Sequence, residues 1–281
     1  MKKKILFTGM SSYLGKNLQP LINQLKGFDL ICYSRRPIPG IKTIVGDLSE
    51  ADKIIRAMSG VDIVVHMASE TSGEDREKLK STNVVGTQNL VYAAKYKKVK
   101  RFIYISSISV MHYLGTPYPD SKKAAEEIVK RNFSNYAIIR PTEIYGGLDS
   151  KHFGLHIDQI KNNRFFFSSR GNHYIQPVYV GDVARAIIRT IKLDEFRGTY
   201  ISAGRAPILK STLYKMIRDK FNKKCILIFV QDIMAFLAIK LFYPLIGKKK
   251  SWKDYKDGLI DRKYRSDFDA ISFKEGLNYL N

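Results

Sequence analysis

Tyr118 and Lys122 stand four residues apart in a stretch that opens a helical pattern. On a helix such a pair projects from one face, and Pro119 suits the first turn because its missing N–H costs nothing there. Lys122 and the positive end of the helix dipole would favour the phenolate of Tyr118 and bring proton transfer within range at neutral pH. Ser107, which ends the apolar run 101–107, could give a second hydrogen bond to a substrate oxygen. These three residues predict a site that moves a proton while a cofactor moves a hydride.

The spacing alone does not identify such a site, because Tyr96 and Lys100 repeat it. That second pair lies in a basic turn, with no serine upstream and no helical pattern after it, so we interpret it as a solvated helix end. The significance of Tyr118 comes from its position after a dinucleotide-binding pattern.

That pattern begins with residues 4–8, a predicted buried strand, and continues through Gly9 and Gly15 into a helical segment that reaches Lys26. Gly9 permits a tight turn, and Gly15 permits close packing of the helix on the strand. Unpaired N–H groups at the start of such a helix face a pyrophosphate.

Two residues depart from the usual pattern. Ser12 replaces the middle glycine, although its hydroxyl could donate a hydrogen bond to phosphate. Pro20 lies inside the first helix and is expected to kink it. Ser12 is also the best support for a function other than catalysis, in which the protein binds the cofactor as a sensor.

The second predicted strand, residues 29–33, ends in Ser34, Arg35 and Arg36. An acidic residue in this place would bind the ribose 2′-hydroxyl of NAD, whereas arginines suit the 2′-phosphate of NADP. We therefore expect NADP, with NAD as the alternative cofactor. The other interpretation is that Arg35 and Arg36 are surface residues that contact no cofactor.

Further strands and helices alternate along the chain. Asp47 follows a short strand and would contact the adenine, and residues 61–69 form a buried strand that ends beside the cofactor. His66 on that strand is expected to be a core residue. The alternation through residues 136–141 predicts an α/β fold, a Rossmann-type doubly wound parallel sheet with right-handed crossovers.

Composition sets broad limits. With 281 residues and 44% apolar content the chain can form one large or two modest domains. Cys32 and Cys225 lie in apolar runs and are expected to be reduced core residues. The run of residues 5–8 that follows the N-terminal lysines is too short for a secretory signal, so the cytoplasm is expected. No metal-ligand spacing is found.

The formal net charge is +22, and residues 205–265 hold 16 lysines and arginines against 5 acidic residues. Such a balance is compatible with nucleic acid, anionic substrates or anionic lipid, or with a solvated surface. We expect no nucleic-acid partner, since only the charge favours one.

Eight short motifs occur in the order found in the extended short-chain dehydrogenase/reductase family. The chain resembles its NAD-dependent epimerase/dehydratase group, which acts on nucleotide sugars. The matching motifs are Gly9–Gly15, Asp47 with Leu48, residues 66–68, Asn83 with 86–87, Ser106 with Ser107, Tyr118 with Lys122, residues 140–146, and residues 178–184.

By this resemblance Ser107 and Tyr118 bind the reacting sugar oxygen, Tyr118 is the acid/base, and Lys122 holds the nicotinamide ribose. The expected cofactor-binding residues are Gly9, Ser11, Ser12, Tyr13, Leu14, Gly15, Ser34, Arg35, Arg36, Asp47, Leu48, Met67, Ala68, Ser69, Asn83, Ser106 and Pro141. The expected substrate-binding residues are Thr142, Glu143, Arg164 and Arg170, of which the two arginines could equally be surface residues.

Ile108 and Ser109 stand where the 4,6-dehydratases of the family have an acidic pair, so water elimination is not expected. The interval from Ser107 to Tyr118 is also short. The leading hypothesis is reduction of a 4-keto nucleotide sugar, and a nucleotide-sugar epimerase is the alternative.

We expect residues 1–146 to form the dinucleotide-binding domain and 147–281 a smaller substrate-binding region, with a return to the sheet around 176–203. Residues 225–246 are a mostly apolar run followed by three lysines. A core helix is expected there, and the alternative is a helix on an anionic membrane, with residues 225–250 as the contact at its inner face. A homodimer is the usual expectation for such an enzyme.

Overall fold

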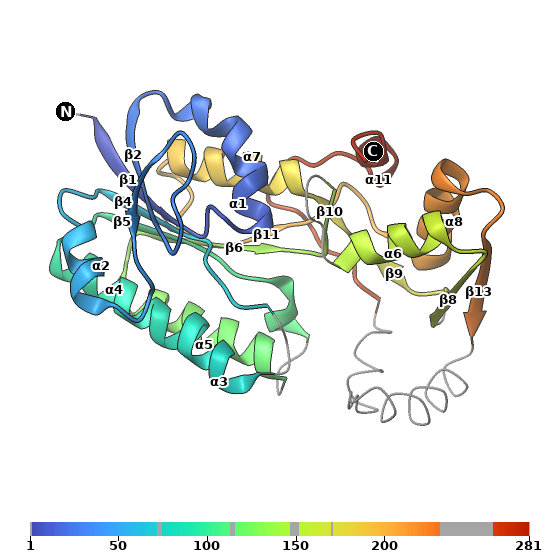
Figure 1. Ribbon diagram of the computed structural model, residues 1–281, viewed down its shortest axis with the longest axis horizontal. Helices are drawn as coiled ribbons and strands as arrows, with labels where there is room; N and C mark the ends of the chain where they lie inside the picture. Colours follow the sequence, from blue (N-terminus) through green and yellow to red (C-terminus); the bar gives the residue numbers. More distant parts are fainter. Residues whose placement is uncertain are drawn as a thin grey trace. The chain divides into compact units, whose positions relative to one another are not determined.

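The computed structural model describes residues 2–71, 75–112, 116–146, 152–169, 171–230 and 261–280. The chain forms two compact units (Figure 1). The first contains residues 1–142 and 180–202, and the second contains residues 143–179 and 203–281. The first unit is therefore built from two separate stretches of sequence.

The first unit is organised around a seven-stranded, wholly parallel sheet with the strand order β11-β6-β5-β4-β1-β2-β3. Its strands are β1 (Lys3–Thr8), β2 (Phe28–Ser34), β3 (Lys42–Val45), β4 (Ile63–His66), β5 (Arg101–Ile105), β6 (Tyr136–Pro141) and β11 (Gly198–Ser202). This arrangement confirms the predicted doubly wound fold. The order reverses between β1 and β4, where ligands of such sheets bind beyond the carboxyl ends of the strands.

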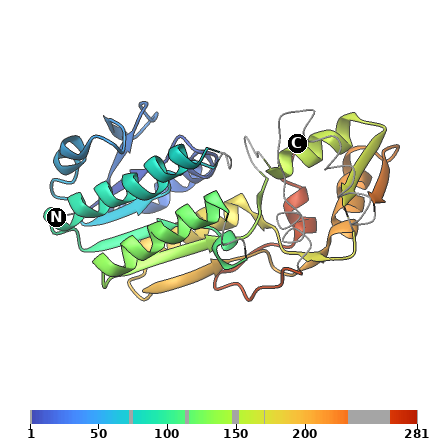
Figure 2. The same cartoon turned by 90° about the horizontal axis from the view of Figure 1, so that it is seen from below.

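Helices cover both faces of this sheet (Figures 1 and 2). One face carries α1 (Tyr13–Leu18), a 3₁₀ helix (Gln19–Leu25) and α7 (Val180–Lys192). The other carries α2 (Ala51–Ala57), α4 (Gly86–Tyr96) and α5 (Pro117–Asn132), with α3 (Arg76–Leu79) and a π-helical segment (Lys80–Val85) leading into α4.

The first helix differs from the expected single helix through Lys26. The α-helical part ends at Leu18 and a 3₁₀ helix continues to Leu25. Pro20 occupies the first turn of that 3₁₀ segment. Since proline has no N–H to give to an α-helical hydrogen bond, the change of helix type at this point follows from its position.

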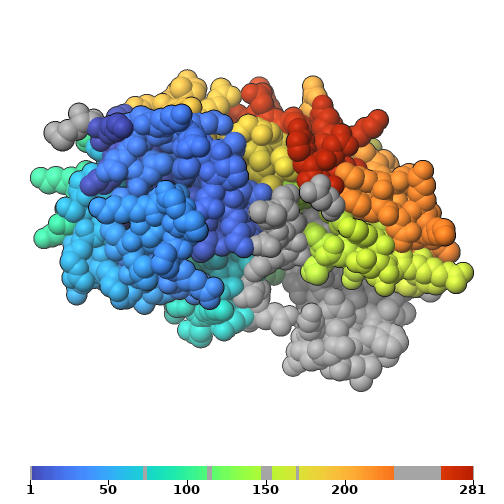
Figure 3. All heavy atoms as spheres, turned by 45° about the horizontal axis from the view of Figure 1, so that its top comes forward, coloured from blue at the N-terminus to red at the C-terminus, as the bar shows by residue number. Residues whose placement is uncertain are grey.

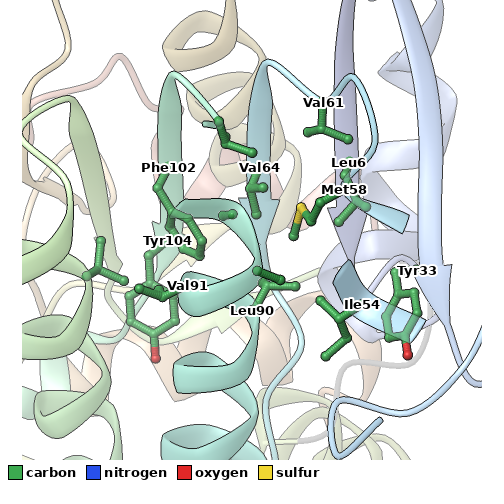
Figure 4. Packing of buried hydrophobic residues seen from close by; sticks show 14 of the residues in the cluster. Leu6, Tyr33, Ile54, Met58, Val61, Val64, Leu90, Val91, Phe102 and Tyr104 are labelled. Carbon is green, nitrogen blue, oxygen red and sulfur yellow. The ribbon is translucent and has the colours of Figure 1, made fainter. Parts of the chain in front are cut away.

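The main core of the first unit lies between the sheet and helices α2, α4 and α5 (Figure 4). Leu6, Val64 and Phe102 point from neighbouring strands towards Leu90 of α4 and Ile54 of α2. All five side chains are fully buried. Adjacent parallel strands buried on both faces account for the near-continuous apolar runs in the sequence.

In its described residues the second unit combines short strand pairs with three helices. Its elements are β7 (Ile144–Tyr145), α6 (His152–Asn162), β8 (Phe165–Ser169), β9 (Tyr174–Ile175), β10 (Val178–Tyr179), β12 (Ile208–Leu209), α8 (Lys210–Phe221), β13 (Ile226–Val230) and α11 (Phe273–Leu277). Strands pair as β7 with β10, β8 with β13 and β9 with β12. Residues 261–280 form part of the surface of this unit (Figure 3), and α11 within them contacts α8.

The expectation of a core helix from Cys225 is wrong for the described part of that run. Residues Ile226–Val230 form a strand that pairs in parallel with β8. A short apolar run does not distinguish a strand from a helix by periodicity, and the pairing with Phe165–Ser169 decides in favour of the strand. Residues 231–260, including the rest of the run and the three lysines, lie outside the described residues.

Candidate active site

The turn after β1 brings the chain against the end of β4. Gly9 has φ +78°, and a Cβ atom there would lie 2.4 Å from the backbone nitrogen of Ala68. A Cβ at Gly15 would lie 2.4 Å from the Cα of Met10. Both positions therefore require glycine, and the turn lies where the strand order of the sheet reverses.

Ser12 caps the first helix instead of facing outward from the turn. Its Oγ accepts a hydrogen bond from the backbone N–H of Gly15 at 3.2 Å. Leu14 is buried behind it, and Tyr13 is half-buried in the first turn. Ser12, which stands where the usual pattern has a glycine, therefore caps the first helix.

Arg35 and Arg36 follow β2 and are both exposed. Together with Ser11 they line an open pocket of about 430 Å³. The Ser34 hydroxyl, buried at the strand end, accepts a weak hydrogen bond from the Arg36 N–H at 3.4 Å. Within the described part of the chain neither guanidinium is in an ion pair, so both are available to an anion. These residues fit the phosphate-bearing end of a dinucleotide.

Asp47 and Leu48 form the turn after β3. The exposed Asp47 carboxylate accepts hydrogen bonds from the backbone N–H and the hydroxyl of Ser49, at 3.0 and 2.9 Å. Leu48 packs on Gly86, where a Cβ atom would lie 2.9 Å from the leucine Cβ. The turn is thereby fixed against the start of α4, and contact of either residue with an adenine stays a prediction.

Tyr118, Ser107 and Ser69 come together beyond the ends of β4 and β5. Tyr118 is the second residue of α5 and is half-buried. Burial raises its pKa to about 12, and hydrogen bonds with the side chains of Ser107 and Ser69 act in the opposite direction. The expected lowering of this pKa is therefore wrong for the chain as it stands, because loss of water around the phenol outweighs the favourable contacts.

Ser107 is itself held in place. Its Oγ accepts hydrogen bonds from the backbone N–H and the hydroxyl of Ser109, at 3.2 and 2.9 Å. Because both contacts use lone pairs of Ser107, its own proton remains to be donated towards Tyr118 or a bound oxygen. Ser109, which stands in place of an acidic residue, thus orients a neighbouring hydroxyl.

Lys122 lies one turn below Tyr118 on α5 and is almost completely buried. Its Nζ donates a hydrogen bond to the backbone oxygen of Ile105 at 2.7 Å and lies 4.3 Å from the centre of the Tyr104 ring. Burial lowers its pKa to about 7, and the nearby Glu126 opposes the shift. Burial thus makes the Lys122 amine a weaker base than an exposed lysine.

Asn83 connects the loop after β4 to the start of α5. Its Oδ1 accepts from the N–H of Glu70 at 2.7 Å, and its Nδ2 donates to the Glu70 carbonyl at 3.0 Å and to Ser121 Oγ at 2.9 Å. The Ser121 hydroxyl in turn donates to the carbonyl of Tyr118 at 2.7 Å. The buried carboxamide thus positions the backbone on either side of the phenol, and its predicted contact with a cofactor is untested.

Glu126 was not among the predicted site residues. It is completely buried one turn after Lys122 and binds the Arg140 guanidinium through both oxygens, at 2.8 and 2.6 Å. The pKa of Glu126 is lowered although burial alone would raise it, since Arg140, Ser106 and Lys130 favour the carboxylate. The regular spacing of Tyr118, Lys122 and Glu126 was the available signal, because it places all three on one helix face.

His66 is completely buried, as expected of a core residue. Its Nδ1 lies 2.7 Å from Thr8 Oγ1 and its Nε2 lies 3.0 Å from Thr87 Oγ1. Thr87 gives its own proton to the Asn83 carbonyl at 2.6 Å, so it accepts from a protonated Nε2. Burial, and then Lys122, lowers the His66 pKa to about 3, which keeps the ring neutral.

The remaining predicted residues divide between the two units. In the first, Met67 is buried beneath Gly9, and Pro141 ends β6 ahead of the buried Thr142. In the second, Glu143 forms an ion pair with Arg262, and the exposed Arg164 lies over the Phe165 ring. Arg170 lies outside the described residues.

The described residues contain no cluster of three or more His, Cys, Asp or Glu side chains placed to bind a metal ion. Nor does any described helix have the length and apolar character needed to cross a bilayer.

A family model described as the NAD dependent epimerase/dehydratase family matches residues 5–201. A 3-beta-hydroxysteroid dehydrogenase of Mycolicibacterium neoaurum is 31% identical over 120 residues, which cover 38% of this chain and 33% of that protein. An Escherichia coli O157:H7 enzyme named N-acetyl-alpha-D-glucosaminyl-diphospho-ditrans,octacis-undecaprenol 4-epimerase is 26% identical over 68% of this chain and 64% of its own length. The chain thus spans less than two thirds of either relative.

Among solved structures, dTDP-4-dehydrorhamnose reductase from Bacillus anthracis in complex with NADP superposes with a TM-score of 0.74. The alignment covers 99% of this chain and 98% of that one, at 20% sequence identity. At this identity the similarity shows a common fold.

Proposed function

Because the chain belongs to the NAD-dependent epimerase/dehydratase family, we propose that it is an NADP-dependent oxidoreductase that reduces a keto group, at C4, of a nucleotide-linked hexose. The observation that supports this most is that the Ser107 and Ser69 side chains lie close enough to Tyr118 to affect the pKa of its phenol. These hydroxyls follow the carboxyl ends of β4 and β5, the same edge of the sheet as the Gly9 turn after β1.

The pKa of Tyr118 suits the proposed direction of the reaction. With a pKa of about 12 the phenol is protonated at neutral pH and can donate its proton to the substrate oxygen as the carbonyl becomes a hydroxyl. Ser107 would hold that oxygen with its own proton. A bound nicotinamide supplies the hydride. Lys122 lies one turn further along α5, where its Nζ donates to the Ile105 carbonyl.

For NADP rather than NAD, the support is the two guanidinium groups of Arg35 and Arg36 beside Ser11, neither of which has a carboxylate partner among the described residues. A 2′-phosphate offers them charge-assisted hydrogen bonds that the NAD ribose lacks. We expect NADP to raise the melting temperature of the chain more than NAD at the same concentration, since the tighter ligand stabilises more. Replacing both arginines with serine should abolish that difference, whereas replacing the exposed Arg76 of α3 should preserve it.

The test of the proposal is Tyr118→Phe. We expect this substitution to lower kcat/KM for NADPH-dependent reduction of a 4-keto nucleotide sugar by about 10²–10⁴-fold, because the proton donor is lost while the ring remains. Affinity for NADPH should change little. Tyr96→Phe is the matched control, since Tyr96 has the same spacing to a lysine but is 64% exposed. Unchanged turnover by Tyr118→Phe would contradict the assignment.

A second candidate is a nucleotide-sugar epimerase. The Escherichia coli relative supports the reaction type, since it is named a 4-epimerase, and its named substrate carries the sugar on diphospho-undecaprenol. Epimerisation removes a hydride and returns it to the opposite face of the same carbon, so it consumes no cofactor. Product analysis distinguishes the two reactions, because a reductase oxidises one NADPH for each product and an epimerase oxidises none. A protein that binds NADP but turns over neither substrate would instead be a sensor.

A further inference from the structure

Strands β8 and β13 of the second unit present apolar side chains to solvent. Their parallel register places Ile226 beside Phe165 and Ile228 beside Phe167. Because side chains alternate along a strand, Phe166 enters the core, while Phe165, Phe167 and Ile226 are 44%, 65% and 48% exposed. These three side chains form what we name the β8–β13 face, and Figure 1 shows the two strands that carry them.

Four exposed cations border this face. Lys161 and Arg164 precede β8, and Lys223 and Lys224 precede β13. The two turns are joined, because the Ile226 N–H donates to the Arg164 carbonyl at 2.8 Å and Asn222 Nδ2 donates to the Lys161 carbonyl at 3.3 Å. In the described ranges of the chain none of the four cations has a carboxylate partner. Uncompensated positive charge therefore collects where both strands begin.

An apolar surface with a cationic border has the two properties that a protein needs to bind a membrane surface. Apolar side chains enter the boundary between headgroups and acyl chains, and lysines and arginines attract anionic headgroups. The sequence after β13 continues the same composition, with an apolar run to Ile246 followed by three lysines. We propose that the β8–β13 face docks the protein on a membrane surface that contains anionic phospholipid.

Vesicle co-sedimentation of the full chain tests this docking. The chain should sediment with vesicles of equal parts phosphatidylglycerol and phosphatidylcholine, and much less with pure phosphatidylcholine. Raising the salt concentration should release it, because screening shortens the range of the attraction.

Variants separate the apolar from the charged contribution. Phe167→Asp should lower the partition coefficient by about tenfold or more, since it removes a large inserted side chain. Tyr92→Asp is the matched control, because Tyr92 is 61% exposed on α4 of the first unit and its replacement changes net charge equally. Lys223→Gln with Lys224→Gln should lower partition by about fivefold for each lysine.

Equal binding of wild-type chain and Phe167→Asp to the anionic vesicles would overturn the proposal, as would equal binding to both vesicle types. Failure of the wild-type chain to sediment with the anionic vesicles would also overturn it. Phe167-dependent self-association in light scattering, or Phe167-dependent binding of a single-stranded oligonucleotide, would then identify a different occupant of the face. Melting temperatures of all variants establish that they are folded. If Phe167→Asp does not fold, the lysine variant and Phe167→Ser decide the outcome.

Discussion

At the scale of single residues, burial changes the ionisation of Tyr118 and Lys122 more than their mutual proximity does. The sequence predicts both residues and their common helix face, and it predicts a lowered phenol pKa from the adjacent ammonium group. It does not reveal that the lysine Nζ is turned to the Ile105 carbonyl and the Tyr104 ring. Desolvation depends on residues distant in sequence, so spacing along one helix cannot predict it.

Lys122 should make stability depend on pH. Its pKa falls from 10.5 in the unfolded chain to about 7 when folded, so the unfolded chain binds more protons between these values. Stability contributed by this residue therefore rises from pH 7 upward and is lowest below pH 7, where the buried amine is charged. We expect Lys122→Met to reduce the gain in unfolding free energy between pH 7 and pH 9 by on the order of 2 kcal/mol.

Denaturant titrations at the two pH values measure this gain, and Lys123→Met is the control. Lys123 is its sequence neighbour, with a side chain 40% exposed that pairs with Glu127. An identical pH dependence in wild type and Lys122→Met would show that burial of the amine has no energetic consequence.

At the scale of elements, helix α5 is joined to the sheet by a buried ion pair. The sequence predicts strands β1, β5 and β6 and the start of α5 closely, because each is a strong local pattern. It did not predict the contact of the Glu126 carboxylate with Arg140 of β6, because this contact depends on which face of the helix packs on the sheet. The strand β13 was missed for a similar reason, since only its partner β8 distinguishes it from a helix.

Glu126→Gln should lower the unfolding free energy by about 3–5 kcal/mol, because it leaves the Arg140 charge buried beside a neutral amide. Glu127→Gln on the next position should cost less than about 1 kcal/mol, since Glu127 pairs with Lys123 and Lys130 at the surface. Urea titrations of the two single variants measure the contrast. Similar losses of unfolding free energy in both variants would mean that the Glu126–Arg140 pair stabilises the protein no more than a surface ion pair does.

At the scale of the whole molecule, the chain leaves the first unit after Thr142 and returns at Val180. The departing and returning segments meet, because Ile144 of β7 pairs with Val178 of β10. The sequence predicts a return to the sheet near residues 176–203 from the last helix and strand pattern. The division at residue 146 stays a prediction, since neither periodicity nor composition marks a domain boundary there.

A fragment of residues 1–146 should not fold stably. It lacks β11, the neighbour of β6, and the Leu193 and Phe196 carbonyls that accept from the buried Arg101 guanidinium at 3.1 and 2.6 Å. Residues 1–142 joined by a short glycine linker to 180–202 should fold, because every strand of the sheet is present. Circular dichroism melting of the two fragments compares them, and cooperative unfolding of residues 1–146 alone would refute the expectation.

The carboxamide of Asn83 pairs with the backbone of Glu70 as a neighbouring strand would, with one donor and one acceptor. Its remaining donor reaches Ser121, whose hydroxyl holds the Tyr118 carbonyl. A local fluctuation that frees the side chain must loosen both segments together. The loop after β4 and the first turn of α5 therefore open as one cooperative unit, and their amide hydrogens should exchange with solvent deuterium at a common rate.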